Sequence, residues 1–386
     1  MKIRIILLIA VAFALAFGNG IYVSAKDGKG ENSGSKEAPV ADLWKAVELA
    51  AEGDTVFIAA GTYSGKDGCG QWKISKSISI IGGVEDKTFK PTKCGQWCNA
   101  TILKRDPKSK CSKPSVPMLE FASVKDILVQ DLVLDGVPCN TYDSSGCLIG
   151  KSAVLTPLVL ISGKSGLRIN GCIVANSFGG GIKMVAEEGE NQITNCTVIN
   201  AIGSGIEFAA GGTSAKCAIT NNQVLLTWEN DSTGGFGILV GKDGSAEIGY
   251  NKIAHSLSAG IGNPFGNKSL SIVNNKFFMN RGGDYAKSAK VDKKSMIRFS
   301  EICADSAFIK CEGNENGKPD IDIPREVLKV SRMGCFAPKL KLVIEPTKIS
   351  VELEVAGKMM RHGAPGGPGR DKGGPGGNRG PRNRNR

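Results

Sequence analysis

Two consecutive stretches, LRINGCIVANSFGGGI at Leu167–Ile182 and QITNCTVINAIGSGI at Gln192–Ile206, decide the fold of this chain. Each joins a short alternation of apolar and polar residues to a Gly-rich motif that ends in Gly-Ile. Aligning them places Cys172 opposite Cys196, one repeat further along the chain. Alternation with a period of two is typical of strands, and Asn and Gly favour turns with positive φ. The two stretches therefore predict one repeated unit of short strands and tight turns.

The same pattern continues in three further segments, AITNNQVLL, EIGYNKIAH and LSIVNNKFF, which extend the aligned column. Its later members follow at similar steps along the chain: Asn222, Asn251 and Asn275. A second column comes from the Gly-Ile motifs: Ile182, Ile206, Ile238 and Ile261. A period of about 20–30 residues built from β-runs indicates a stacked solenoid, and the patterns of leucine-rich and helical repeats are absent. We predict an all-β fold, a right-handed parallel β-helix of about ten coils, with inward apolar columns and ladders of turn Asn residues.

The organisation of the chain follows changes in composition. ADLWKAVELAAEGD has apolar residues at helical spacing, which predicts a short capping helix at 41–51 over the first coil. Such a cap is expected because an open coil end exposes unpaired strand edges. The predicted segments are a signal peptide at 1–25, a flexible leader at 26–38, the β-helix at 39–300, C-terminal strands that complete or cap it at 301–360, and a disordered basic tail at 361–386.

The N-terminal residues have the composition of a secretion signal. Lys2 and Arg4 precede an uninterrupted apolar run from Ile5 to Phe17, and a Val-Ser-Ala exit follows, with cleavage expected near Ala25. This run is too short to span a bilayer. We therefore expect no transmembrane segment and a secreted, extracellular or cell-surface protein, with the periplasm as a further compartment.

The net charge of +12 comes mostly from the tail. Residues 361–386 contribute +6 and Lys2 and Arg4 contribute +2, which leaves +4 for the body of the chain. The body is therefore not a basic domain, and no nucleic-acid partner is expected. We expect the tail to bind polysaccharide or an anionic cell surface through its arginines: Arg379, Arg382, Arg384 and Arg386. The oligomeric state is not indicated.

Twelve cysteines in an exported chain favour disulfides, since the CxxC pairs of zinc sites are absent. The candidates are Cys69, Cys94, Cys98, Cys111, Cys139, Cys147, Cys303, Cys311 and Cys335.

The tetrapeptide CGQW occurs at Cys69–Trp72 and again at Cys94–Trp97, an offset that is close to one coil. This offset predicts stacked copies, with Trp72 against Trp97. Cys69 and Cys94 would then lie within disulfide range, with Cys98 or Cys111 as alternative partners. The neighbouring apolar runs give similar steps, which predict successive coils at Val56, Ile80 and Ile102.

AAEGDTVFIAAGTYSG, ISKSISIIGGV and ATILKRD, followed by the Gly-Ile units, resemble secreted right-handed parallel β-helix proteins of the pectate-lyase-like superfamily. The resemblance covers about residues 40–290 and implies a fold rather than an activity. Members include polysaccharide lyases, epimerases and hydrolases as well as adhesins. Motifs that some of these enzymes carry, Asn-Thr-Asp, Gly-His-Gly and Asp-Pro-His-Asp, are absent from this chain.

Candidate catalytic residues are few. The residues after the Gly-Ile motifs are expected to point outward, so Lys183 and Glu207 fall side by side on adjacent coils. They are candidates for a base–acid pair, and a plain cross-strand ion pair is the alternative. His255 aligns with the turn residues Asn176 and Asn200, and Arg281 is the remaining weak candidate.

Candidate ligand-binding residues come from an insertion and from tryptophans. TWENDST at Thr227–Thr233 lengthens one turn and is expected to project, exposing Trp228, Glu229 and Asp231 to a sugar or to Ca²⁺. The alternative is a tolerated loop with Trp228 folded onto the coil. Trp72 and Trp97 are further candidates for sugar binding.

EGNENG at Glu312–Gly317 has the spacing of the first half of a calcium loop, which makes Glu312, Asn314 and Asn316 weak metal candidates. No cofactor is required by any motif, and Ca²⁺ is the one metal for which ligands are suggested.

Two functions remain open. The first is a secreted or cell-surface protein that binds polysaccharide without catalysis. The second is a polysaccharide lyase or epimerase that acts on an acidic, uronate-containing glycan with a Lys or Arg base. The sequence favours the first and does not decide whether the protein is an enzyme.

Overall fold

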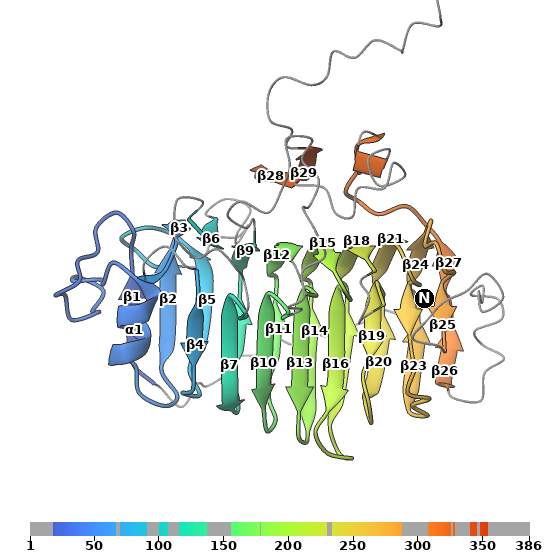
Figure 1. Ribbon diagram of the computed structural model, residues 1–386. Coiled ribbons are helices and arrows are strands. Elements are labelled where there is room, and N and C mark those ends of the chain that lie inside the picture. The colour runs from blue at the N-terminus through green and yellow to red at the C-terminus, as the bar shows by residue number, and fades with distance from the viewer. Residues whose placement is uncertain are drawn as a thin grey trace, which may run out of the picture.

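The computed structural model of the protein describes residues 18–66, 70–90, 100–106, 116–136, 156–177, 179–229, 234–287, 308–325, 327–328, 340–345 and 348–353. Within these ranges the chain winds into a stack of coils with one short helix at its N-terminal end (Figure 1). The predicted all-β parallel β-helix is confirmed by three long parallel sheets, called A, B and C below.

The three sheets take one strand each from successive coils. Sheet A contains β1 (Gly20–Val23), β2 (Thr55–Ala59), β5 (Ser79–Val84), β8 (Leu128–Gln130), β11 (Arg168–Asn170), β14 (Glu190–Thr194), β17 (Lys216–Thr220), β20 (Ser245–Gly249), β23 (Leu270–Val273) and β26 (Phe308–Glu312). Sheet B contains β3 (Gly61–Tyr63), β6 (Thr101–Lys104), β9 (Leu132–Asp135), β12 (Ile173–Ser177), β15 (Thr197–Ile202), β18 (Gln223–Trp228), β21 (Lys252–Ser256), β24 (Lys276–Phe278) and β27 (Glu315–Asn316). Sheet C contains β4 (Trp72–Ile74), β7 (Leu119–Val124), β10 (Val159–Gly163), β13 (Ile182–Ala186), β16 (Ile206–Ala210), β19 (Ile238–Val240), β22 (Ile261–Gly262) and β25 (Tyr285–Ala286).

The core is built from inward columns of apolar side chains. One column on sheet A runs through eight coils in unbroken register, and every member is fully buried: Val56, Ile80, Val129, Ile169, Ile193, Ile219, Ile248 and Ile272. β-branched side chains suit this position because their stiff rotamers pack against the next coil. Burying one such side chain contributes about 1.5–3 kcal/mol, so the stack of columns is the main stabilising feature.

A sharp corner joins sheet A to sheet B, and from β8 onward one left-handed residue makes this turn in each described coil. Seven corner residues have φ between 53° and 65°: Asp131, Gly171, Asn195, Asn221, Tyr250, Asn274 and Gly313. Gly adopts this conformation without a Cβ clash, and Asn and Asp tolerate it better than other residues. This requirement explains why the repeat places Asn or Gly before the aligned column.

The residue after this corner forms a buried asparagine ladder. The side-chain oxygens of Asn222, Asn251, Asn275 and Asn314 each accept from the backbone N–H of the preceding coil at 2.9–3.0 Å. The amide nitrogens of Asn222, Asn251 and Asn275 donate to the next Asn oxygen or to core carbonyls. The predicted register of Cys172, Cys196, Asn222, Asn251 and Asn275 is therefore confirmed.

The predicted capping helix is also present. α1 (Leu43–Leu49) buries Leu43, Ala46 and Val47 against the first coil, and the Asp42 carboxylate accepts from the N–H of Trp44 at 2.7 Å as an N-cap. Lys76 closes the other end by donating to the carbonyls of Val47, Glu48 and Ala50 at 2.6–3.0 Å. Both ends of this short helix are thus satisfied by side chains.

Residues 20–23, which lie within the predicted signal peptide at 1–25, form strand β1 in the structure. β1 pairs in parallel with β2, and Val23 and Ser24 are buried. Residues 34–40 line the outer edge of β1, since Tyr22 donates its N–H to Gly34 O and accepts from Val40 N. The leader predicted at 26–38 is therefore folded back onto β1 and shields an edge that would otherwise be unpaired.

The winding of the first coils differs from the prediction at one step. Val56 pairs with Ile80 as expected, but Ile80 pairs next with Val129. Ile102 lies on sheet B instead, between Thr62 and Val133. The coil that runs from Ile80 to Val129 is therefore much longer than the predicted step from Ile80 to Ile102.

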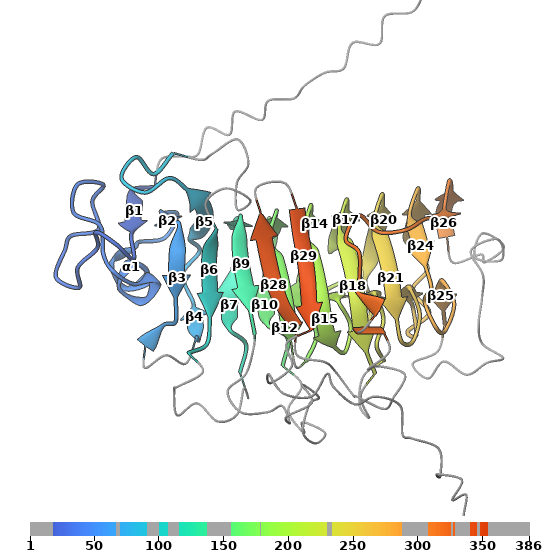
Figure 2. The ribbon, with the colours of Figure 1, turned by 90° about the horizontal axis from the view of Figure 1, so that it is seen from above.

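The C-terminal strands extend and cover the β-helix. β26 and β27 join sheets A and B beyond the predicted boundary at residue 300. β28 (Leu340–Glu345) and β29 (Lys348–Leu353) pair with each other in antiparallel register and lie over the outer face of sheet B (Figure 2). There Leu340, Ile349 and Val351 bury the outward side chains of sheet B: Val133, Ile173, Ile199, Leu225 and Ala254. The predicted basic tail lies outside the described residues.

No helix among the described residues is long and apolar enough to cross a membrane.

Candidate functional site

A single outward column runs along sheet C from the first coils toward the last. Pairing between successive strands aligns seven residues one above another: Lys73, Glu120, Leu160, Lys183, Glu207, Leu239 and Gly262. This set is called the sheet C column below. Strands in one sheet lie about 4.8 Å apart, so the column presents a regularly spaced row of functional groups along the axis of the stack.

Two cross-strand ion pairs lie within the sheet C column. The Lys183 ammonium is 2.8 Å from the Glu207 carboxylate, and the Lys73 ammonium is 3.4 Å from Glu120. The predicted adjacency of Lys183 and Glu207 is confirmed. Their side chains are 35% and 24% exposed, so both charges reach the surface. Such a pair contributes about 0.2–1 kcal/mol to stability.

Aliphatic side chains separate and follow the charged pairs. Leu160 lies between Glu120 and Lys183, and Leu239 follows Glu207; both are partly exposed. Next to Leu239, Phe236 packs over Gly262, where a Cβ would come within 2.6 Å of the ring. The face therefore alternates charged and apolar patches on a rigid sheet.

The prediction that Trp228 is exposed on a projecting insertion is contradicted, and the alternative, Trp228 folded onto the coil, is confirmed. Trp228 ends β18 and is 5% exposed, because the C-terminal segment covers this part of sheet B. Its indole N–H donates to Asn200 Oδ1 at 2.7 Å, and Asn200 in turn donates to Asn176. Glu229 accepts from the Ser258 hydroxyl at 3.3 Å, and Asp231 lies outside the described residues.

Trp72 is also a core residue rather than a sugar-binding one. It opens β4 on sheet C, is 1% exposed, and pairs with Leu119 of the next coil. The stacked CGQW arrangement is contradicted at this point, since Leu119 is the sheet C neighbour of Trp72. Trp97, Cys69 and Cys94 lie outside the described residues.

The other catalytic candidates do not join Lys183 and Glu207. His255 lies on sheet B at φ 58°, in the same column as Asn176 and Asn200, as predicted. The centroid of its ring lies 5.6 Å from that of the Phe278 ring, with the two rings nearly perpendicular, and burial lowers the pKa of its imidazole. Arg281 is exposed in the turn after β24. The four candidates are spread over two sheets and a turn.

Two of the three predicted calcium ligands are engaged in structural contacts. Asn314 Oδ1 accepts from both the backbone N–H and the side-chain amide of Asn275, so its oxygen is not available to a cation. Glu312 pairs with Lys310 at 2.8 Å, and Asn316 is exposed in β27. Within the described ranges no group of three or more His, Cys, Asp or Glu side chains is arranged to hold a metal.

Four of the twelve cysteines lie in the described parts of the chain. Cys311 of β26 is disulfide-bonded, and Cys172, Cys196 and Cys217 are buried free thiols. Burial raises the pKa of Cys172 and of Cys217, which keeps both thiols neutral and unreactive. The remaining disulfide candidates lie outside the described residues: Cys69, Cys94, Cys98, Cys111, Cys139, Cys147, Cys303 and Cys335.

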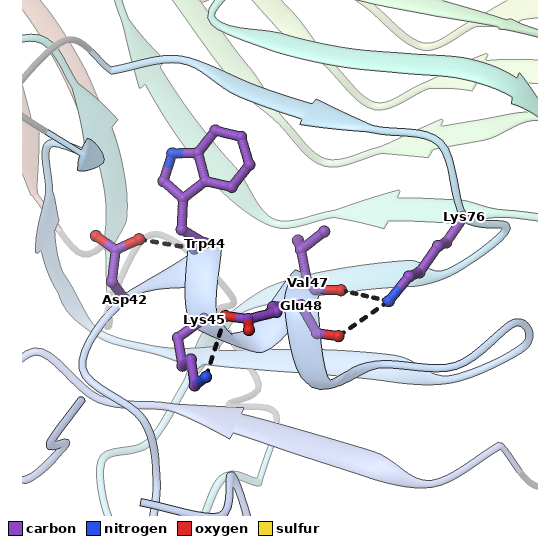
Figure 3. Close-up of polar contacts among 6 residues, drawn as sticks. All are labelled: Asp42, Trp44, Lys45, Val47, Glu48 and Lys76. Atoms are coloured by element: carbon purple, nitrogen blue, oxygen red, sulfur yellow. Dashed lines mark hydrogen bonds and ion pairs between the residues drawn. The ribbon is translucent and has the colours of Figure 1, made fainter. Parts of the chain in front are cut away.

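Sequence reasoning missed a groove beside the capping helix. It has a volume of about 740 Å³ and is lined by Asp42, Trp44, Lys45, Val47, Glu48, Lys66 and Lys76. Trp44, which is 37% exposed, stands on α1 at this surface (Figure 3). We refer to this feature as the Trp44 groove.

Most charged groups of the Trp44 groove already have partners. Lys45 pairs with Glu48 at 3.0 Å, and Lys76 is bound to the helix carbonyls (Figure 3). Lys66 is exposed and has no ion-pair partner within the described residues. The preceding residue, Gly65 at φ 69°, lies against Trp72, where a Cβ would come within 3.1 Å of the indole. The buried Trp72 therefore supports the wall that carries Lys66.

No protein-family model matches the sequence, and no curated protein matches it. Among solved structures, the chain is similar to a GH136 lacto-N-biosidase from Eubacterium ramulus, with a TM-score of 0.43 and 12% identity over 70% of this chain and 58% of that one. This chain thus spans less than two thirds of that protein. A pectate lyase gives a TM-score of 0.35 and 13% identity over 71% and 77% of the two chains. A pectin methylesterase from Erwinia chrysanthemi gives 0.34 and 11% over 61% and 79%. Similarities at this level transfer no activity to this chain.

Proposed function

We propose that this protein is a secreted or cell-surface β-helix that binds polysaccharide along the outer face of sheet C, without cleaving it. The observation that supports this proposal is the unbroken register of the sheet C column. Its seven residues place two Lys–Glu pairs and two leucines on one line along the stack.

The chemistry of the column suits a polysaccharide. Ammonium and carboxylate groups donate to and accept from sugar hydroxyls, and the ammonium groups also attract the carboxylates of acidic sugars. Leu160 and Leu239 offer apolar surface to the C–H face of a sugar ring. Because a linear polymer repeats its groups along one direction, it can meet several coils at once, and weak contacts then add up by multivalency.

The pairing inside the column favours binding over catalysis. A general base has to be free to take a proton from the substrate within hydrogen-bond reach. Lys183 instead donates to Glu207 at 2.8 Å. The pair also holds both side chains in place, so little side-chain freedom is lost on binding.

The proposal is tested with two matched pairs of substitutions. Lys183→Ala with Glu207→Ala removes the pair on sheet C, and Lys216→Ala with Glu190→Ala removes a cross-strand Lys–Glu pair on sheet A, at 3.5 Å. Mobility is measured in native gels that contain alginate, pectate or chondroitin sulfate. We expect one of these polymers to retard the wild type and the sheet A variant, and to bind the sheet C variant about tenfold more weakly. The proposal would be refuted if both variants were retarded equally. It would also be refuted if no polymer retarded the wild type.

A lyase or epimerase is the second candidate, and the Lys183–Glu207 pair is the observation that favours it. If substrate displaced Glu207 and the Lys183 ammonium released its proton to solvent, the neutral Lys183 amine would be free to take a proton from the substrate. Incubation with the same three polymers, with and without a chelator, would then produce new ultraviolet absorbance from the unsaturated product of β-elimination. An epimerase would instead change the uronate composition of the recovered polymer. Neither change is expected for a binding protein.

The basic tail is the second binding element of this proposal. Residues 361–386 carry seven Lys or Arg and one Asp, so they are attracted to polyanions at low salt. Truncation after Gly363 is expected to lower retention on an anionic cell surface at low ionic strength, while gel retardation through sheet C persists. Unchanged retention would show that the tail does not contribute to binding.

A further inference from the structure

Trp44, on the wall of the Trp44 groove, is exposed at the surface and does not belong to the hydrophobic core. Of the three tryptophans in the described part of the chain, Trp72 and Trp228 are buried at 1% and 5% exposure, whereas Trp44 is 37% exposed. The helix below it is fixed by the Asp42 cap and by Lys76, so the indole is held on a rigid element. A fixed, exposed indole offers a large contact surface at a low cost in conformational entropy.

The polar rim of the groove adds one unused positive charge. Lys45 faces Glu48, and Lys76 is bound to three carbonyls, but Lys66 has no partner within the described residues. Among the described residues that line the groove, Lys66 is therefore the cation left to meet an anionic group held against the indole. The apolar wall formed by Trp44 and the charged rim that includes Lys66 together fit a ligand that has one flat apolar face and polar edges.

The position of the groove links it to sheet C. α1 packs against β4, and β4 carries Lys73, the first residue of the sheet C column. Lys76 follows β4 closely in the chain, and Lys66 precedes it. The groove therefore lies at the head of the same face that is proposed to hold a polysaccharide.

We infer that the Trp44 groove is a saccharide-binding subsite, in which one sugar ring stacks on Trp44 and an acidic substituent of that sugar points to Lys66. The subsite extends the polysaccharide binding proposed above, and it rests on that proposed function. The subsite would mark one end of the binding face. A polysaccharide that lies along the sheet C column would place one sugar ring in the groove, beyond Lys73.

The test uses a tetrasaccharide of galacturonate, and its uncharged methyl ester, in titration calorimetry. Trp44→Ala is expected to weaken binding of both probes about tenfold, because stacking area is lost whatever the charge. Trp44→Phe keeps a ring and should stay within about threefold of the wild type. Lys66→Gln should weaken binding of the acid about two- to fivefold and leave the ester unchanged. Leu49→Ala is the control, since Leu49 is 39% exposed on the same helix and does not line the groove.

The outcomes separate this subsite from the proposed function. If the Lys183 and Glu207 double variant loses binding and Trp44→Ala does not, the subsite is wrong and sheet C binding stands. If Trp44→Ala loses binding and the double variant does not, the subsite stands and the sheet C column is wrong. Failure of wild-type protein to bind either probe, or full binding by both variants, overturns the subsite. Equal losses in Trp44→Ala and Leu49→Ala indicate damage to the helix and also overturn it.

Discussion

At the residue scale, one position in each coil carries much of the specificity of this fold. The residue after the left-handed corner is Asn in four successive described coils and Cys in the two before them. Sequence alignment predicted this column from Cys172 to Asn275. It missed Asn314, which was assigned to calcium because EGNENG has the spacing of a metal loop and because the repeat fades before it. Asn314 fits both the local metal-loop motif and the long-range repeat, and the structure places it in the buried asparagine ladder.

Replacing Asn251 by Ala tests the ladder. The Asn251 side chain makes four buried hydrogen bonds, two donated to Ile219 O and Asn275 Oδ1 and two accepted from Asn222. Their loss leaves buried groups unsatisfied, so the free energy of unfolding is expected to fall by about 2–5 kcal/mol in urea titrations. Gln192→Ala, on the exposed side of β14, should change it by about 0.5 kcal/mol or less. A loss at Asn251 no larger than at Gln192 would contradict the role of the ladder.

His255 makes a pH-dependent contribution to the free energy of unfolding, and burial of its imidazole determines the sign of that contribution. Desolvation lowers the pKa of its imidazole in the folded state below the ordinary value of 6.5. The unfolded chain therefore binds the proton more tightly, and stability is lost as pH falls below about 6.5 toward the folded pKa.

His255→Asn removes this titration, and Asn suits the site because Asn176 and Asn200 occupy the same column at positive φ. Urea midpoints at pH 7.5 and 5.0 should fall less in this variant than in the wild type, while carboxylates contribute equally to both. Identical falls in the two proteins would show that His255 does not titrate across unfolding.

At the element scale, the strands were more predictable than the connections between them. The repeats from Leu167 to Phe278 gave correct register because their period is nearly constant. Between β5 and β8 the chain inserts two long connections, so counting residues placed Ile102 on the wrong sheet. The prediction that Trp228 is exposed was wrong for another reason. A two-residue period shows that a side chain points outward, but it does not show that β28 and β29 come back to cover that face.

The first strand predicts where the mature protein begins. β1 is paired along its length, and the Asn19 N–H donates to Asp54 Oδ1 at 2.7 Å. Cleavage near Ala25 would remove this strand, whereas the small-residue pattern Ala14-Leu15-Ala16 leaves it intact. If the protein is secreted as proposed, we therefore expect N-terminal sequencing of its mature form to start upstream of Asn19, at about Phe17. A mature terminus at Lys26 would contradict the pairing of β1 with β2.

At the scale of the whole molecule, the three faces of the β-helix differ in what covers them and in which side chains they present. Sheet B is covered by the C-terminal segment. Sheet A carries an apolar cluster of Tyr22, Phe57 and Ile81 on its first coils and the Glu190–Lys216 pair farther along the stack. Sheet C carries the aligned column of charged and aliphatic residues. The repeat allowed the Lys183–Glu207 contact to be predicted from sequence. The Trp44 groove was not predictable, because it is formed by a helix, a loop and a strand end that no repeat relates.

The most direct test of the central claim is a lysine acetylation footprint read by mass spectrometry. Wild-type protein is labelled with acetic anhydride with and without the polysaccharide that retards it in gels. Lys73 and Lys183 on sheet C should become protected about threefold or more, and Lys216 on sheet A, which is 62% exposed, should not. Protection of Lys216 with continued labelling of Lys73 and Lys183 would place the ligand elsewhere and contradict the account.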